Sequence, residues 1–317
     1  MQSTGRFTDD LRRLVARSYN ICQCCSLTLP HEIAAYAGYT FDGTPIYVGQ
    51  CCVDKIDELA THVYWWWEAD KRCEPDTCLW RYMDFAKFVG LLEARALFFC
   101  RADLLGDGFE GAAGIAERRG TYDQFYLDFF RNAVRTAPGQ TVPPPTEQVE
   151  HEAHRLLAEF TATGERDRKT SFVSCWHANT GESEALWRLY CPPSTVGVAI
   201  ETTAQALVEA YGNDTKIKLG RVQYVDYRRS FAGIHDRIFW KRKSLSHEAE
   251  IRAVATQHGE QLDAGILIPV DVEKLCKSVI PSPFAPDWFV NVLSATIKRF
   301  EIDLDITQSE LLAEPFF

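Results

Sequence analysis

Short apolar segments of strand length alternate closely with segments of helical spacing from Leu79 to the end of the chain. Apolar runs bounded by turn residues favour strands, and apolar positions spaced three or four residues apart favour helices. The expected strands are residues 79–82, 96–100, 171–177, 197–202, 221–227, 246–255 and 266–270, and the expected helices are 85–93, 122–135, 146–161 and 286–300. This pattern predicts one α+β domain over residues 78–317.

Two of the expected helices, residues 122–135 and 146–161, follow each other across a proline-rich loop. Thr146 is followed by acidic residues in the next turn, which favours the start of a helix at that point. No expected strand lies between the two helices. We therefore predict that residues 120–165 form a helical insertion in the domain.

Composition limits the classes of protein to which the chain can belong. Of its 317 residues, 46% are hydrophobic and 25% are charged, as is typical of a globular protein. We expect a cytoplasmic protein with no membrane partner, because no apolar run is long enough to cross a bilayer and residues 1–13 lack the apolar centre of an export signal. The net charge of −10 disfavours a general polyanion-binding surface.

Residues 1–70 are predicted to form a cysteine-rich, loop-rich unit. Cys22 and Cys25 are separated by two residues, and Cys51 and Cys52 follow a glycine-containing stretch. Without an export signal, such thiols are expected to be reduced, and four of them can hold zinc in tetrahedral geometry. Other residues compete for the fourth place or stay free, namely Cys24, His31, Cys73 and Cys78.

Polar and apolar residues alternate from Ser246 to Ala253. In a strand, this period places Glu248, Glu250 and Arg252 on one face. Adjacent carboxylates suit a reaction in which one supports a developing positive sugar and the other orients an acceptor, because close like charges raise one pKa. In a helix, Glu248 and Arg252 instead form an exposed ion pair. Both interpretations remain open.

Further candidate binding residues lie on other segments of the domain. The guanidinium of Arg81 can bind a diphosphate beside the ring of Tyr82, although a salt bridge at the edge of the core also explains a lone arginine. Ser174 can bind a ribose hydroxyl or satisfy a neighbouring backbone group. Trp187 and Tyr190 lie on one side of a helical segment, where they can stack on a flat ring or pack in the core.

In order and spacing, these segments resemble a bacterial family known as the domain of unknown function DUF2971. The resemblance covers about residues 79–300. The motifs that carry it are Leu79-Trp-Arg-Tyr82, Ala96-Leu-Phe-Phe99, Asp107-Gly-Phe-Glu110, Ser171-Phe-Val-Ser-Cys175, Leu186-Trp-Arg-Leu-Tyr190, Val196-Gly-Val-Ala-Ile-Glu201, Trp240-Lys, Glu248-Ala-Glu-Ile-Arg252 and Ile280-Pro-Ser-Pro-Phe284. The turn before Phe109 usually reads Asn-Asp-Pro in that family, and here it reads Gly-Asp-Gly.

Arg81, Ser174 and Glu248-Ala-Glu250 also resemble the Arg, Ser and Glu-x-Glu of ADP-ribosyltransferases. The resemblance implies a mixed, mostly antiparallel sheet and NAD as the substrate. It implies that Arg81 binds the phosphate or ribose, that Ser174 steadies the nicotinamide side and that Tyr190 or Trp187 stacks on the ring. Glu250 would bind the ribose 2′-hydroxyl and stabilise the oxocarbenium-like transition state, and Glu248 would orient the acceptor.

Three functions follow from these features. The first is an NAD-dependent ADP-ribosyltransferase or NAD glycohydrolase, acting as a toxin or phage-defence effector on a protein or nucleic-acid acceptor and controlled by an antitoxin or regulatory partner. The second is a non-enzymatic, zinc-containing protein that binds a partner or nucleic acid. The third is a metal-dependent nuclease or hydrolase whose carboxylates are Asp107, Glu110, Glu248 and Glu250.

Overall fold

The computed structural model describes residues 73–317 apart from 138–141, 143, 193, 213–216, 234–236 and 260–262, together with the backbone of three short strands before residue 73. These strands form an antiparallel sheet in the order β2-β1-β3, with β1 at Tyr36–Thr40, β2 at Pro45–Val48 and β3 at Thr61–Tyr64. The predicted zinc ligands Cys22, Cys25, Cys51 and Cys52, like Cys24 and His31, lie outside the described residues.

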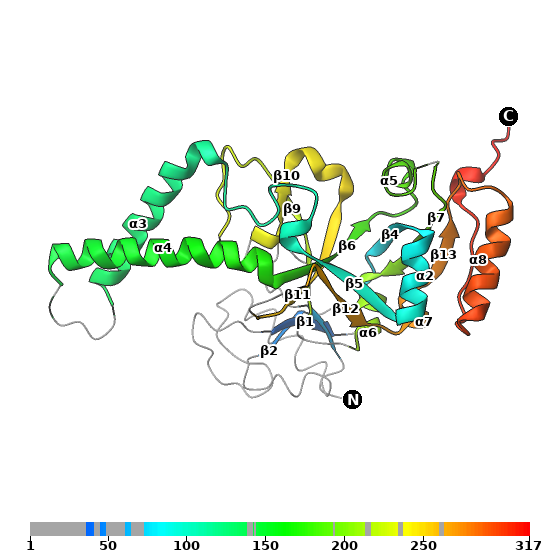
Figure 1. The fold of residues 1–317 in the computed structure, drawn as a ribbon, viewed down its shortest axis with the longest axis horizontal. Coiled ribbons are helices and arrows are strands. Elements are labelled where there is room, and N and C mark those ends of the chain that lie inside the picture. The colour runs from blue at the N-terminus through cyan, green and yellow to red at the C-terminus, as the bar shows by residue number, and fades with distance from the viewer. Residues whose placement is uncertain are drawn as a thin grey trace.

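An eight-stranded antiparallel sheet forms the centre of the described domain (Figure 1). Its main path is β12-β5-β6-β4-β7-β13, and β11 and then β8 extend the sheet from the other edge of β6. The strands are β4 (Cys78–Asp84), β5 (Ala96–Arg101), β6 (Ser171–Ala178), β7 (Gly197–Thr203), β8 (Ile217–Arg221), β11 (Glu250–Thr256), β12 (Gly265–Pro269) and β13 (Ser278–Pro281). The predicted α+β class with a mostly antiparallel sheet is confirmed.

Helices cover the sheet and bury its apolar face. The main core packs Leu79 and Trp176 of the sheet against Phe88 and Leu207 of the helices. All four side chains are fully buried. Asp84 fixes the start of the first of these helices, since its carboxylate accepts a hydrogen bond of 2.9 Å from the amide of Lys87. The helices are α2 (Phe85–Ala94), α5 (Glu184–Tyr190), α6 (Ala204–Ala210), α7 (Val272–Leu275) and α8 (Trp288–Arg299).

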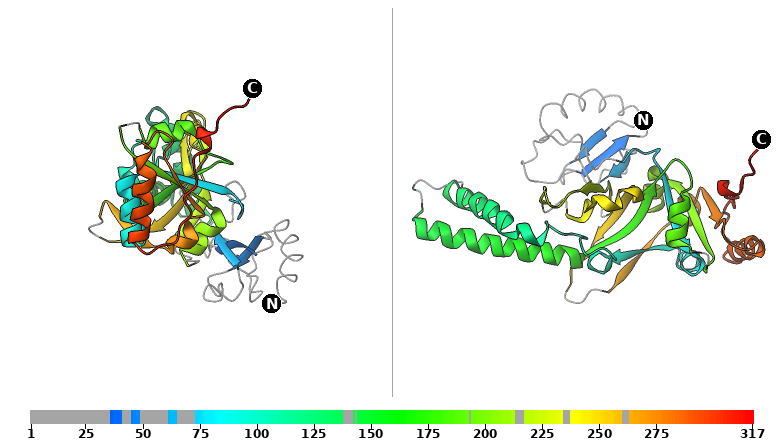
Figure 2. Two further views of the ribbon diagram at one scale, coloured as in Figure 1. Left: turned by 90° about the vertical axis from the view of Figure 1, so that its right-hand side faces the viewer. Right: turned by 90° about the horizontal axis from the view of Figure 1, so that it is seen from above.

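A helical hairpin projects from one end of the sheet, made of α3 (Arg119–Arg135) and α4 (Thr146–Thr170) (Figures 1 and 2). The two helices are joined by aromatic packing, with the rings of Tyr126 and Phe160 4.4 Å apart. An ion pair of 2.7 Å between Arg131 and Glu150 adds to the contact. The hairpin occupies the residues of the expected insertion, but α4 continues to Thr170, beyond its expected end at residue 161.

Two expected strands differ from the structure. Residues 221–227 contain only the end of β8 and the short β9 (Gln223–Val225), which pairs in parallel with β10 (Trp240–Arg242). The strand expected over 246–255 begins only at Glu250, because Lys243–Glu248 forms a 3₁₀ helix. Within the described part of the chain, no helix has both the length and the apolar character needed to cross a membrane.

Candidate functional site

The central strand β6 has two different partners along one of its edges. On its other edge it pairs continuously with β11, from Ser171 to His177. On the divided edge, β5 pairs with residues 172–173 and β4 pairs with residues 177–178. The sheet therefore forks beside residues 174–176, where neither β4 nor β5 pairs with β6.

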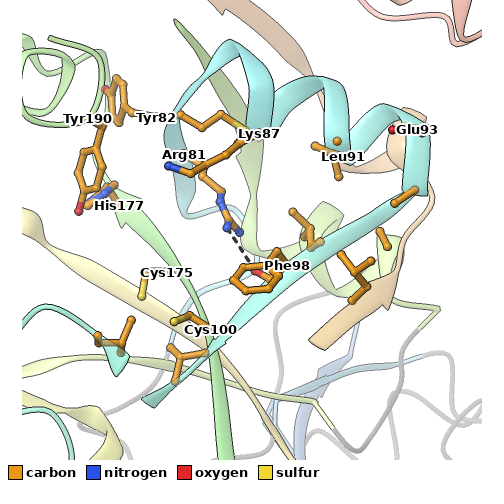
Figure 3. A pocket seen from close by; sticks show the side chains of 18 residues that line it. Arg81, Tyr82, Lys87, Leu91, Glu93, Phe98, Cys100, Cys175, His177 and Tyr190 are labelled. Atoms are coloured by element: carbon orange, nitrogen blue, oxygen red, sulfur yellow. Dashed lines mark hydrogen bonds between the residues drawn. The ribbon is translucent and has the colours of Figure 1, made fainter. Parts of the chain in front are cut away.

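A cavity of about 580 Å³ lies at this fork (Figure 3). Its sides come from β4, α2, β5 and β6, together with Tyr190 of α5 and Leu267 of β12. A volume of this size falls within the range of small-molecule sites. The cavity is therefore the candidate functional site of the described domain.

Arg81 crosses the fork from β4. Its guanidinium donates hydrogen bonds to the hydroxyl of Ser174 and, over 3.4 Å, to the carbonyl oxygen of Phe98. The guanidinium carbon also lies 5.4 Å from the ring centre of Trp176. Burial lowers the pKa of Arg81 from its ordinary value, but an arginine remains charged at neutral pH. The structure thus brings two predicted site residues, 93 positions apart in sequence, into direct contact beside the cavity.

Two of the three aromatic residues predicted to bind the cofactor line the cavity. Tyr190 is 38% exposed, and its ring centre lies 5.3 Å from that of His177. Tyr82 is buried, and its hydroxyl accepts a hydrogen bond of 2.9 Å from the amide of Ser183. Trp187 is fully buried, packs edge-on against Tyr82 and donates to Glu182, so it belongs to the core behind the cavity. Trp187 therefore does not line the cavity.

Glu248 and Glu250 lie close together, as predicted, but a turn brings them together and not the alternation of a strand. Glu248 ends the 3₁₀ helix, and Ala249 then adopts the left-handed conformation, with φ 42° and ψ 49°. Glu250 is the first residue of β11. The turn brings both carboxylates to the ammonium of Lys241, at 2.5 Å from Glu248 and 2.8 Å from Glu250. An exposed pair between Glu248 and Arg252 is not formed.

Glu250 is held between two cations. It is 1% exposed, and its second oxygen lies 2.6 Å from the Nε of Arg252. Burial by itself would raise the pKa of this carboxyl, yet the charges of Arg252 and Lys241 outweigh burial and lower the pKa to about 2. Glu250 is therefore a fixed negative charge at every pH at which the protein is expected to work.

Glu110 completes this acidic cluster, which we define as Glu110, Lys241, Glu248, Glu250 and Arg252. Glu110 lies 2.7 Å from Arg252 and 3.5 Å from Lys241. Three carboxylates thus face two cations, and the cluster carries a net charge of −1 when all five groups are ionised. Asp107, the other acidic residue of the same turn, lies outside it and pairs with Arg242 at 2.8 Å.

Cys175 and His177 lie between the cavity and the acidic cluster, and Tyr190 lies beside His177. All three line the cavity. His177 contacts the carbonyl oxygen of Glu248 at 2.8 Å through Nδ1, and the Cys175 side chain contacts the Glu250 carboxylate. Neither Glu248 nor Glu250 lines the cavity itself. The two carboxylates therefore lie directly behind one side of the cavity rather than on its surface.

No known protein family, curated protein or solved structure matches this chain. The chemistry of the site has to be argued from its own residues.

Burial leaves His177 neutral and keeps Cys175 in the thiol form. Burial lowers the pKa of His177, although its contact with the Glu248 carbonyl opposes the change. Burial and then the charge of Glu250 raise the pKa of Cys175 well above its ordinary value. A thiol is a poor nucleophile in that state. The side of the cavity next to the acidic cluster is therefore polar but uncharged.

Some of these residues could be predicted from the sequence. Alternation along 171–177 places Cys175 and His177 on one face, and β6 has that arrangement. Lys241 was missed as a site residue, because no sequence spacing connects it to carboxylates across a 3₁₀ helix. Cys73 and Cys78, named above as competing zinc ligands, are free thiols in the structure, and among the described residues no group of three or more His, Cys, Asp or Glu is placed to hold a metal.

Proposed function

We propose that the protein binds NAD in the fork cavity and cleaves its bond between nicotinamide and ribose, as an ADP-ribosyltransferase or an NAD glycohydrolase. One observation carries the proposal: Arg81 of β4 and Ser174 of β6 meet at a cavity that has the carboxylates of Glu248 and Glu250 directly behind it. The DUF2971-like motifs and the ADP-ribosyltransferase-like series contribute these same residues.

The phosphate and nicotinamide groups of NAD have suitable partners in the cavity. The guanidinium of Arg81 provides planar donors for a phosphate oxygen, and Lys87 adds a second cation on the same side. The half-exposed ring of Tyr190 offers a face on which nicotinamide can stack. Tyr82 and Phe98 supply further aromatic surface.

The proposed reaction breaks the bond between C1′ of the ribose and the nitrogen of nicotinamide. The bonding electron pair leaves with nicotinamide, which becomes neutral, and positive charge develops on the ribose. The fixed charge of Glu250 stabilises that positive charge. An acceptor hydroxyl, or water, then forms the new bond to C1′, and Glu248 receives its proton. Glu248 is the more accessible carboxylate, with 10% of its side chain exposed against 1% for Glu250.

The proposal requires the side chains between the cavity and the carboxylates to move when NAD binds. Tyr190 is the residue placed to do so, because it lies at the end of the seven-residue helix α5 and is the most exposed of the three.

The test is release of free nicotinamide from NAD by purified protein, with and without cell lysate as a source of acceptors. We expect release by the wild-type protein and loss of release in Glu250→Gln and Arg81→Met. Glu159→Gln is the matched control, since its exposed carboxylate pairs with Arg155 on the hairpin, away from the cavity. Release that requires lysate indicates transfer, and release without lysate indicates hydrolysis.

Absence of release by the wild-type protein under both conditions would count against the proposal. Equal release by wild-type and Glu250→Gln protein would exclude the role given to Glu250. A chelator arm tests the metal-dependent hydrolase, which the geometry disfavours because the ammonium of Lys241 already lies within 3.5 Å of three carboxylates. The alternative function, a zinc-containing interaction protein, depends on cysteines that lie outside the described residues.

A further inference from the structure

A second cavity, of about 300 Å³, lies where α4 meets the sheet. It shares no lining residue with the fork cavity. An apolar cluster lies between the two cavities. Its residue Val173 lines the fork cavity, and its residues Val254 and Ile238 line the second cavity. Whatever binds in the second cavity is therefore not in contact with a ligand at the fork.

The second cavity is positively charged in a protein whose net charge is −10. Its lining includes three cationic side chains, Arg168, Lys218 and Arg237, and a single carboxylate, Asp167. These four groups sum to a charge of +2. Hydroxyl groups supply further hydrogen-bond donors, from Thr163, Thr170, Ser171 and Thr256.

Two of the cations have unused donors in the interior. Arg237 is only 6% exposed, and its guanidinium donates to the hydroxyl of Tyr122 at 2.7 Å while its Nε has no hydrogen-bond partner among the described residues. The Nε of Arg168 is likewise buried without a partner in the described part of the chain. A buried donor without an acceptor costs about 1–3 kcal/mol. An anion in this cavity would supply acceptors to both.

Lys218 adds a third cation to the same cavity. It projects from β8, and burial lowers the pKa of its ammonium, although the charge of Asp167 opposes the change. Gly164 shapes the cavity, since a Cβ at that position would lie 1.3 Å from the Nη1 of Arg237. A side chain there would displace Arg237 from its place. The glycine on α4 is thus required for the arginine to reach the cavity.

We propose that this cavity binds a phosphate group, either as free phosphate or as the phosphate of a nucleotide. Arg168, Arg237 and Lys218 bind its oxygens, with the hydroxyls around them as additional donors. The charge-assisted hydrogen bonds from planar guanidinium groups fit a tetrahedral phosphate well. The assignment is independent of NAD cleavage at the fork.

The test measures the affinity for inorganic phosphate and for AMP by titration calorimetry at constant ionic strength, together with the rise in Tm that each produces. We expect binding by the wild-type protein and an affinity at least about tenfold lower in Arg168→Gln and Lys218→Met, since one charged hydrogen bond is worth about 1.5–3 kcal/mol. Arg166→Gln is the matched control, because Arg166 is exposed on the same turn of α4 and lines neither cavity.

Comparison of the two ligands distinguishes free phosphate from a nucleotide phosphate, and one further variant tests which cavity binds it. Tighter binding of AMP identifies a nucleotide phosphate, and equal or weaker binding of AMP identifies free phosphate. Arg81→Met retains phosphate binding if the site is the second cavity. Two results would overturn the proposal. The first is loss of phosphate binding in Arg81→Met while Arg168→Gln and Lys218→Met retain it. The second is no binding by wild-type protein at millimolar phosphate. If Lys218→Met does not fold, Arg168→Gln decides, because Arg168 is only half-buried.

Discussion

Replacing Lys241 by Met removes the cation shared by the three carboxylates of the acidic cluster. The charge of the cluster then changes from −1 to −2, and only Arg252 remains to balance Glu110, Glu248 and Glu250. The Lys241 side chain is 9% exposed and its ammonium lies 2.5, 2.8 and 3.5 Å from the three carboxylates, so little solvent is available to replace it. Methionine has a similar length and no charge, so the main effect is electrostatic.

The size of the effect follows from the pKa of Glu250. A fall from the ordinary 4.5 to about 2 corresponds to about 3 kcal/mol, since each pKa unit is worth about 1.4 kcal/mol. Lys241 and Arg252 together provide this stabilisation and also offset the cost of burying Glu250. Lys241 forms ion pairs with the other two carboxylates as well. Removal of one partner from a buried pair costs about 3–5 kcal/mol. We therefore expect the free energy of unfolding of Lys241→Met to be about 3 kcal/mol lower at pH 7.

The loss should depend on pH in a defined direction. In the wild-type protein the folded-state pKa of Glu250 lies below its unfolded value, so its contribution is complete above about pH 4.5 and is lost as the pH falls towards 2. In the variant, a carboxylate without its cation has a folded-state pKa above the unfolded value. That carboxylate destabilises the fold as the pH rises. The difference between the two proteins should therefore be smaller at pH 5 than at pH 7.

Urea denaturation followed by tryptophan fluorescence at both pH values measures this difference. Lys274→Met is the matched control, because its ammonium also makes a 2.8 Å ion pair but is 62% exposed, and such pairs contribute about 1 kcal/mol or less. Lys241→Met combined with Glu248→Gln restores the charge of −1 and should recover part of the loss. A loss below about 1 kcal/mol in Lys241→Met, or the same loss at both pH values, would refute the reasoning.

Two further predictions concern packing and thiol chemistry. Gly197→Ala should lower the free energy of unfolding by about 1–3 kcal/mol, because its Cβ would lie 2.4 Å from the Cys191 sulfur and 2.7 Å from a backbone oxygen. Gly90→Ala, in open space within α2, should raise the free energy of unfolding by up to about 1 kcal/mol. Equal effects of the two substitutions in urea denaturation would contradict this prediction. Burial raises the pKa of Cys276 from 9.0 to about 12, so alkylation of Cys276 by iodoacetamide at pH 8, followed by mass spectrometry, should be at least about a hundredfold slower in native than in denatured protein. Similar rates would show that the thiol is not buried as described.

The sequence predicted the elements whose periodicity is local. Strand β4 and helix α2 follow the expected ranges closely, because apolar residues mark their buried positions and Asp84 marks the boundary between them. Helix α4 extends further than expected, since its last turns are polar and owe their order to contacts with distant segments of the chain, including the approach of Arg237 to Gly164. Local pattern carries no information about such contacts.

The candidate site was predictable only in part for the same reason. Alternation suggested that Glu248 and Glu250 lie together, and they do, but through the left-handed turn at Ala249 and the ammonium of Lys241. The residues before Ala249 form a 3₁₀ helix, so strand alternation does not describe the position of Glu248. The contact between Arg81 and Ser174 depends on the fork in the sheet, which no short segment of sequence specifies.

The fork cavity and the acidic cluster are built from contacts between residues far apart in the chain. Arg81 and Ser174 are 93 residues apart, and Glu110 and Arg252 are 142 residues apart. Contacts that close such long loops form late, because their entropic cost has to be met before they contribute stability. During synthesis, the nascent chain has no complete site until β11 has been made and has paired with β6. Because Leu267 of β12 also lines the cavity, the site is complete only after β12 has been synthesised.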